Sequence, residues 1–173
     1  MNYATGFVNF VGKTLRGLRD VSQASERLKE LGLVLPEVAK PVAAYVPAVR
    51  TGNLVFVSGQ LPVAGGRLTA TGKVGAEVTE EEGRKAARQC ALNALAVLAE
   101  AAGGIDNVVR IVKVSGYVAS APGFTGQPGV VNGASELFRD VFGPGGEHAR
   151  AAVGVAELPL GAPVEVELVA EVR

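Results

Sequence analysis

The 173-residue sequence contains one cysteine, Cys90, and one histidine, His148. A single cysteine excludes a disulfide within the chain, which is typical of a reducing compartment, so we expect a cytoplasmic protein. One cysteine and one histidine also exclude the usual zinc-ligand clusters, and we expect no metal site.

The chain also lacks an excess of charge and a long apolar run. Seventeen basic residues balance seventeen acidic ones, so we expect neither a nucleic acid nor a membrane as partner. No apolar run reaches the roughly 18 to 20 residues of a membrane span. The acid-poor N-terminal segment carries its basic residues after its apolar stretch, whereas a signal peptide carries them before it.

That N-terminal segment has several interpretations: a targeting peptide, a surface helix, a poorly ordered extension or an upstream start. We place residues 1–22 outside the core fold and residues 23–173 in a single domain. Hydrophobic residues make up 48% of the chain, enough to bury a substantial core.

Apolar patterns alternate between strand-like and helix-like stretches. The long helix has the clearest boundaries, because Thr79 and Glu82 form a capping box and Gly103 is typical of a helix end. Cys90 lies on the small-residue stripe of this helix and is expected in the core. We expect strands at 42–49, 54–58, around 67–68, 108–119, 149–156 and 164–172, and helices at 26–31 (capped by Ser25), 79–102 and 128–142.

This order of elements predicts an α+β fold in which two helices pack on one face of one sheet. The last strand alternates apolar residues with a mixed set that contains Glu165 and Glu167. The preceding strand places Ala152 and Gly154 on the same face as Arg150, which is not a plainly solvated set. Both patterns predict that the second face of the sheet is partly buried in an oligomer.

Standard catalytic motifs are missing. Ser58 lies in V-S-G-Q rather than in the G-x-S-x-G elbow of a hydrolase. There is no P-loop and no G-x-G-x-x-G after a strand, so no nucleotide cofactor is expected. His148 follows a glycine-rich stretch and is expected to be a loop residue rather than a base.

Polar residues at strand ends are the remaining candidates, and Arg150 is the most informative of them. Its planar guanidinium suits a carboxylate or phosphate bound through two hydrogen bonds. From spacing alone, the favoured alternative is that Arg150 pairs with Glu165 or Glu167 on a neighbouring strand. Glu165 in turn is compatible with an ordinary solvated position.

Two stretches together resemble the YjgF/Rid family of reactive intermediate deaminases, whose relatives have also been labelled endoribonuclease L-PSP-like. They are GNLVFVSGQLPV at 52–63 and ARAAVGVAELPLGAPVEVELVAEV at 149–172, and the resemblance extends over residues 43–172. The resemblance implies a chorismate-mutase-like fold and a homotrimer with ligand clefts between subunits. It also implies a small carboxylate-bearing substrate, a 2-imino acid that is hydrolysed to a 2-keto acid and ammonia.

The resemblance further implies roles for individual residues. Arg150 would hold the substrate carboxylate, and Glu165 would position the attacking water. Two departures from the family pattern are Ala152, where deaminating members often carry a small polar or thiol residue, and His148 in place of a proline. The remaining residues implied to line the cleft are Tyr45, Ser58, Gly59 and Asn132.

Two alternatives to the deaminase stay open. The first is a non-catalytic trimer that binds small carboxylates as a sensor or scaffold. The second is a ribonuclease, against which the balanced charge and the lack of a basic aromatic surface argue.

Overall fold

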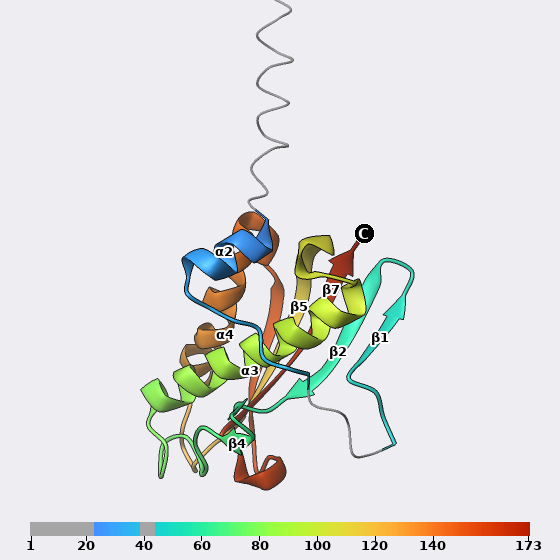
Figure 1. The fold of residues 1–173 in the computed structure, drawn as a ribbon. Coiled ribbons are helices and arrows are strands. Elements are labelled where there is room, and N and C mark those ends of the chain that lie inside the picture. The colour runs from blue at the N-terminus through green and yellow to red at the C-terminus, as the bar shows by residue number, and fades with distance from the viewer. Residues whose placement is uncertain (1–22, 39–43) are drawn as a thin grey trace, which may run out of the picture.

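The computed structural model of the chain describes residues 23–38 and 44–173. It contains a five-stranded sheet with two long helices on one face (Figure 1). Every neighbouring pair of strands in this sheet is antiparallel except β5 and β6, which are parallel. Across the sheet the strands are β1 (Ala48–Thr51), β2 (Leu54–Gln60), β7 (Val164–Val172), β5 (Val108–Ala119) and β6 (Ala149–Val155).

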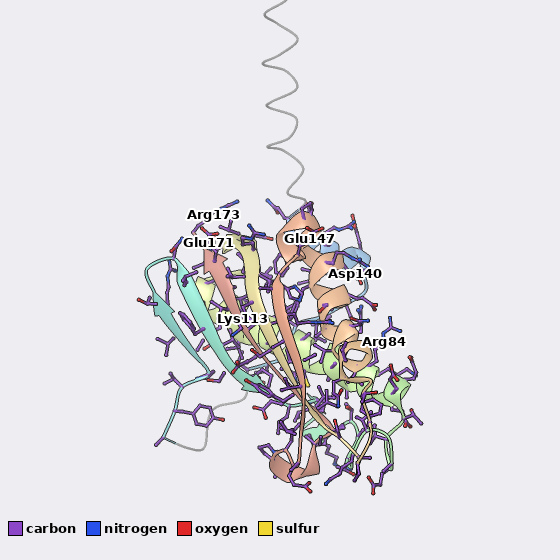
Figure 2. The ribbon with its side chains drawn as sticks, turned by 180° about the vertical axis from the view of Figure 1, so that it is seen from behind. Arg84, Lys113, Asp140, Glu147, Glu171 and Arg173 are labelled. Carbon is purple, nitrogen blue, oxygen red and sulfur yellow. The ribbon has the colours of Figure 1, made fainter. Side chains whose placement is uncertain are left out.

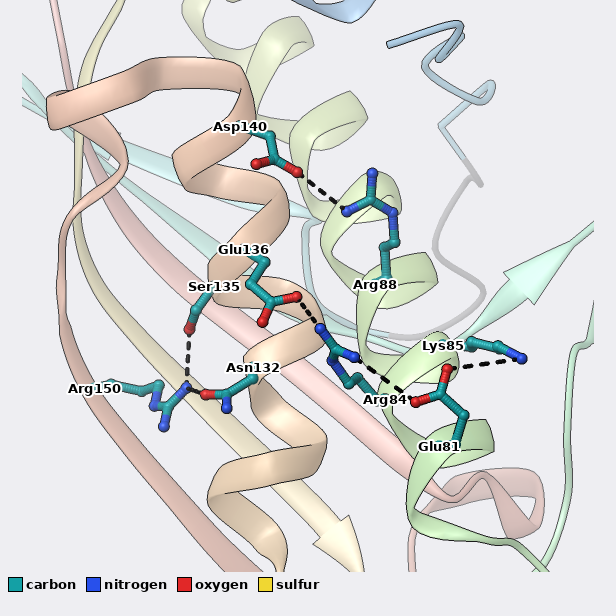
Figure 3. A network of polar contacts seen from close by, with 9 residues as sticks. All are labelled: Glu81, Arg84, Lys85, Arg88, Asn132, Ser135, Glu136, Asp140 and Arg150. Atoms are coloured by element: carbon teal, nitrogen blue, oxygen red, sulfur yellow. Dashed lines mark hydrogen bonds and ion pairs between the residues drawn. The ribbon is translucent and has the colours of Figure 1, made fainter.

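The two long helices are α3 (Glu80–Ala102) and α4 (Gln127–Phe142). The predicted capping box of Thr79 and Glu82 is confirmed, and Gly103 ends α3 in the left-handed conformation at φ 70°. Ion pairs join the exposed sides of the helices: Arg84 pairs with Glu136, and Arg88 lies 3.6 Å from Asp140 (Figure 3). These contacts, together with the core, fix α4 relative to α3.

The remaining elements are short. Helix α2 (Ala24–Glu30) packs against α4, and β3 (Val63–Ala64) pairs with β4 (Arg67–Leu68) in a separate small sheet. Three 3-10 turns complete the described chain: η1 (Ile105–Asn107), η2 (Gly143–Gly146) and η3 (Pro159–Gly161).

Strand β7 shows how the sheet divides into two faces. Val164, Val166, Leu168, Ala170 and Val172 are buried under the helices. The alternate residues of β7, beginning with Glu165, point to the opposite side, which we call the open face. Figure 2 shows the sheet from this side, where no helix of the described residues covers it.

Exposed apolar side chains gather on the open face. Phe56 lies opposite Val169 of β7, and Val49 lies opposite Phe56. Val153 lies opposite Tyr117 on the β6 side of the sheet. Phe56 and Val153 are each 45% exposed, and Val49 is 54% exposed. Such a surface is typical of an interaction site.

Several element boundaries differ from the sequence prediction, among them those of β1, β2 and α2. The strand predicted at 42–49 begins at Ala48, because Pro47 has no N–H to donate to the ladder; positions 42 and 43 of that prediction lie outside the described residues. Strand β2 continues through Gln60, with a register shift after Val57. Ser25 does not cap α2: it lies within the helix, and its N–H and hydroxyl both donate to the Asp106 carboxylate.

Candidate functional site

Arg150 lies near the start of the edge strand β6 and points to the helix-covered face. Its partner on β5 is Val114, which is fully buried under the helices. The guanidinium is bound by α4: Nη1 donates to Asn132 Oδ1 at 2.9 Å and to Ser135 Oγ at 3.0 Å (Figure 3). Nη2 donates to the Pro128 carbonyl oxygen at 3.4 Å.

This placement corrects two predictions from the sequence. Arg150 does not pair with Glu165 or Glu167, because β5 lies between β6 and β7 and the guanidinium points toward α4. Arg150, Ala152 and Gly154 also do not face the open side: Ala152 packs against the core, and a Cβ on Gly154 would lie 2.9 Å from the amide of Gln127 in α4.

The helix α4 positions three acceptors for Arg150 because they share one stripe. Pro128 lies in the first turn, and Asn132 and Ser135 follow at intervals of four and three residues. Residues with these spacings lie above one another on a helix. The sequence resemblance pointed to Asn132 but not to Ser135, although its position three residues after Asn132 was a usable signal.

Two N–H groups of Arg150 have no partner among the described residues. A guanidinium has five donors in a planar fork, and α4 binds three of them. The remaining two are Nε–H and one hydrogen of Nη2, which lie along the same edge of the guanidinium. Arg150, Asn132 and His148 also help to line a pocket of about 430 Å³. This arrangement suits a carboxylate bound through two parallel hydrogen bonds.

His148 lies in the loop before β6, as predicted, and its ring contacts the Arg150 cluster. Nδ1 lies 2.6 Å from the Gly146 carbonyl oxygen, and Nε2 lies 3.0 Å from Ser135 Oγ. The ring packs edge-on against Phe138, with centroids 5.8 Å apart. Burial lowers the pKa of His148, and the nearby Arg150 lowers it further, against the opposing effect of the hydrogen bond to Gly146.

Glu165 lies on the open face of β7, half-buried, opposite Tyr117 on β5. Burial raises the pKa of Glu165, and the neighbouring carboxylate of Glu167 raises it further. The Tyr117 hydroxyl donates to Glu167 Oε1 at 3.0 Å, so it holds the second carboxylate in place. A carboxylate with a raised pKa is suited to accept a proton from water.

Gly59 lies directly against Glu165. A Cβ built on Gly59 would be 2.7 Å from Cδ of Glu165, closer than side chains normally approach. A side chain at position 59 would therefore displace the carboxylate. The structure thus places Gly59 and Glu165 in direct contact, as expected of two residues that line one cleft.

Ser58 and Tyr45 lie at the β1–β2 side of the sheet. The Ser58 hydroxyl donates to the Val46 carbonyl oxygen at 2.9 Å, and its N–H donates to the Pro47 carbonyl oxygen at 2.9 Å. These bonds tie the segment before β1 to β2. Tyr45 lies in a bend of that segment and is 59% exposed. Ser58 also lines an open-face pocket of about 380 Å³, together with Ser115 and Glu167.

Within one chain these residues form two separate clusters. Arg150 and Asn132 lie on the helix-covered side, whereas Glu165 and Gly59 lie on the open face. Opposite Arg150 on β5 is Val114, three residues before the partner of Glu165. Standard strand geometry therefore separates the Cα atoms of Arg150 and Glu165 by roughly 14 Å. A small ligand cannot contact both side chains of the same chain.

Cys90 and possible metal ligands are the other candidate groups. Cys90 is fully buried, as predicted, and burial raises the pKa of its thiol well above the ordinary value. Across residues 23–38 and 44–173, no three His, Cys, Asp or Glu side chains gather where they could hold a metal ion. No helix in the described part of the chain has both the length and the apolar character needed to cross a membrane.

Comparisons with known proteins give consistent matches. The family described as "YjgF/chorismate mutase-like, putative endoribonuclease" matches residues 25–172. Protein TCP17 of Trypanosoma cruzi is 46% identical over 152 residues, which cover 87% of this chain and 95% of that protein. A 2-iminobutanoate/2-iminopropanoate deaminase of Dermatophagoides farinae is 33% identical over 132 residues, covering 76% of this chain and 88% of that one. The crystal structure of Atu1372, a protein of unknown function from Agrobacterium tumefaciens, is 44% identical with a TM-score of 0.81, covering 94% of this chain and 99% of that chain.

Proposed function

Since the chain belongs to the YjgF/chorismate mutase-like family, we propose that it hydrolyses small 2-imino acids to 2-keto acids and ammonia. A relative named 2-iminobutanoate/2-iminopropanoate deaminase, 33% identical, supports this reaction class. The observation that carries the proposal is Arg150, whose guanidinium is held by α4 with one edge left for a carboxylate.

The proposed mechanism needs only orientation and a proton acceptor. Arg150 binds the substrate carboxylate and holds the electrophilic imine carbon in place. Glu165 accepts a proton from water as the water oxygen bonds to this carbon. The carbon–nitrogen bond then breaks, nitrogen leaves as ammonia with the transferred protons, and the 2-keto acid remains. Because its pKa is raised, Glu165 is a better proton acceptor than an ordinary carboxylate.

We further propose that the protein is a homotrimer whose sites lie between chains. Arg150 and Glu165 are on opposite faces of one sheet, so both can reach one substrate only when they come from different copies. The apolar side chains exposed on the open face, among them Phe56 and Val153, supply a surface that another copy would bury. Sedimentation at working concentration tests this, and a monomer contradicts it.

A subunit-mixing experiment tests the shared site directly. Arg150→Ala and Glu165→Gln are each expected to be inactive alone. If each site takes one residue from each of two chains, random mixed trimers restore both residues in about one site in four. Mixing refolded variants should then recover about a quarter of the wild-type rate. No recovery would show that one chain supplies both groups, or that the residues do not act together.

The catalytic role of Glu165 is tested by rate assays on 2-imino acids generated enzymatically in place. Glu165→Gln is expected to keep the fold and lower the rate by roughly ten- to ten-thousand-fold, as is typical for loss of a general base. Glu167→Gln is the matched control, because its amide oxygen still accepts the bond from Tyr117. Equal rates in wild type and Glu165→Gln would remove the proposed role.

The second candidate function is a trimer that binds small carboxylates without turning them over. Ala152 favours it, because this side chain packs against the core and offers no polar group two residues after Arg150. Binding of keto acids that depends on Arg150, without hydrolysis of any 2-imino acid tested, would establish this function. The family description also names an endoribonuclease, and RNA in the same series of assays tests that activity.

A further inference from the structure

A chain of three hydrogen bonds runs from the backbone through His148 and Ser135 to Arg150. A carbonyl oxygen only accepts, so His148 Nδ1 must donate to the Gly146 oxygen at 2.6 Å. In neutral His148, Nε2 is then an acceptor, and the Ser135 hydroxyl donates to it at 3.0 Å. The Ser135 oxygen is left to accept from Arg150 Nη1 at 3.0 Å. Each donor in this series of three hydrogen bonds therefore has one defined acceptor.

We infer that His148 is a positioning residue that orients Arg150 through Ser135, and that it does so only in its neutral form. The inference rests on the proposed role of Arg150 as the carboxylate anchor. His148 does not touch the ligand edge of the guanidinium. It acts by turning the Ser135 hydroxyl hydrogen away from Arg150, so that the Ser135 oxygen is free to accept a hydrogen bond from Arg150 Nη1.

Protonation of His148 breaks this order. Both ring nitrogens then donate, and the Ser135 hydroxyl hydrogen loses its acceptor. The imidazolium would also face the Arg150 guanidinium across one shared hydroxyl. The other charged side chains that line this pocket are Arg139 and Glu136 from α4 and Glu147 from the loop. Of these, Glu136 is already paired with Arg84.

The resting state matches this role. Half-burial of the ring and the nearby guanidinium lower the pKa of His148, so the neutral form dominates at neutral pH. Two effects oppose one another on acidification. The added charge on His148, separated from the ligand edge by the Ser135 hydroxyl and screened by salt, strengthens binding only modestly. Loss of the hydrogen bond from the Ser135 hydroxyl to His148 Nε2, which orients Arg150 through Ser135, weakens binding by about two- to tenfold. We expect this effect to dominate.

The test titrates 2-oxobutanoate into the full chain at about pH 8 and about pH 5, and the lower value is chosen well below the ordinary histidine pKa because the pKa of His148 is lowered. Wild type should bind about two- to tenfold more weakly at the lower pH. His148→Phe keeps the edge-on contact with Phe138 but loses both hydrogen bonds, so it should bind weakly at both values. His148→Gln places an amide oxygen near the Nε2 position and should recover most of the affinity, without the pH dependence.

Arg150 itself supplies a readout that needs no ligand. The Nη1–H resonance of Arg150, whose hydrogens are bound by Asn132 and Ser135, should be resolved and slow to exchange in NMR spectra at the higher pH in wild type. It should broaden at the lower pH, and in His148→Phe and Ser135→Ala at both. Failure of wild type to bind 2-oxobutanoate would overturn the proposed function, while this resonance still decides the inference. An Arg150 signal that is the same in wild type and His148→Phe would overturn the inference, as would tighter binding on acidification.

Discussion

Replacing Gly59 by alanine gives the sharpest test of the open-face half of the site. Gly59 does not have a positive φ, so alanine is compatible with the backbone of β2. The new Cβ would lie 2.7 Å from Cδ of Glu165, whereas ordinary contact begins at 3.4 Å. The Glu165 carboxyl carbon must therefore move by at least about 0.7 Å, the difference between those distances. Because the obstructing atoms are at the flexible end of a side chain, the fold is expected to survive.

The size of the kinetic effect follows from this displacement. A misplacement of about 1 Å can cost about a hundredfold in rate, because the proton acceptor no longer meets the attacking water in line. We therefore expect Gly59→Ala to lower the rate of 2-imino acid hydrolysis by roughly ten- to a hundredfold. The melting temperature and the binding of 2-oxobutanoate through Arg150 should stay close to those of wild type.

A double-mutant cycle in the same rate assay separates this mechanism from a general disturbance. If Gly59→Ala acts through Glu165, it should cause little further loss in a Glu165→Gln background. Additive losses would mean that the alanine damages the site by another route. Wild-type activity in Gly59→Ala would refute the reasoning. The alanine must displace the Glu165 carboxylate, and displacement of the general base should slow the reaction.

Three further predictions concern other parts of the chain. Arg150→Lys should not rescue Arg150→Ala in titrations with keto acids, because lysine keeps the charge but cannot reproduce the contacts to α4 and the two parallel bonds; equal binding by all three proteins argues against the anchor. Glu165→Gln should become more stable relative to wild type as pH rises from about 4 to about 8, because the raised pKa makes ionisation of Glu165 costlier in the folded state; chemical unfolding across this range shows it, and a constant difference contradicts it. Deleting residues 1–22 should leave assembly and melting temperature nearly unchanged, as sedimentation and thermal melts would show, and loss of assembly would place this segment in the structure.

Local signals explain which parts of the fold the sequence predicted well. The capping box at Thr79 and the glycine at position 103 define both ends of α3 through bonds made within a few residues. The alternation in β7 is equally local, and both its ends and the division of its side chains between two faces are confirmed. The start of β1 at Ala48 differs from the prediction because Pro47 has no N–H to donate to the ladder.

The direction of Arg150 could not be predicted because β6 has no contrast between its faces. Ala149 and Ala151 alternate with Ala152 and Gly154, so small residues occupy both sides. The face is decided by parallel pairing with β5, which brings together residues more than thirty positions apart. The motif therefore identified Arg150 correctly as a candidate but gave no information about where its side chain points.

The same limit applies to the site as a whole. The order β1-β2-β7-β5-β6 places the Ser58 and Tyr45 side of the sheet at one edge and Arg150 at the other. A family motif identifies such residues in the sequence, but it does not show whether one chain can bring them to the same ligand. Here Arg150 and Glu165 lie on opposite faces of the sheet, so one chain cannot bring both side chains to the same small ligand. If both side chains serve one reaction, association of the chains must create the site, and the activity per chain must fall when dilution separates the copies.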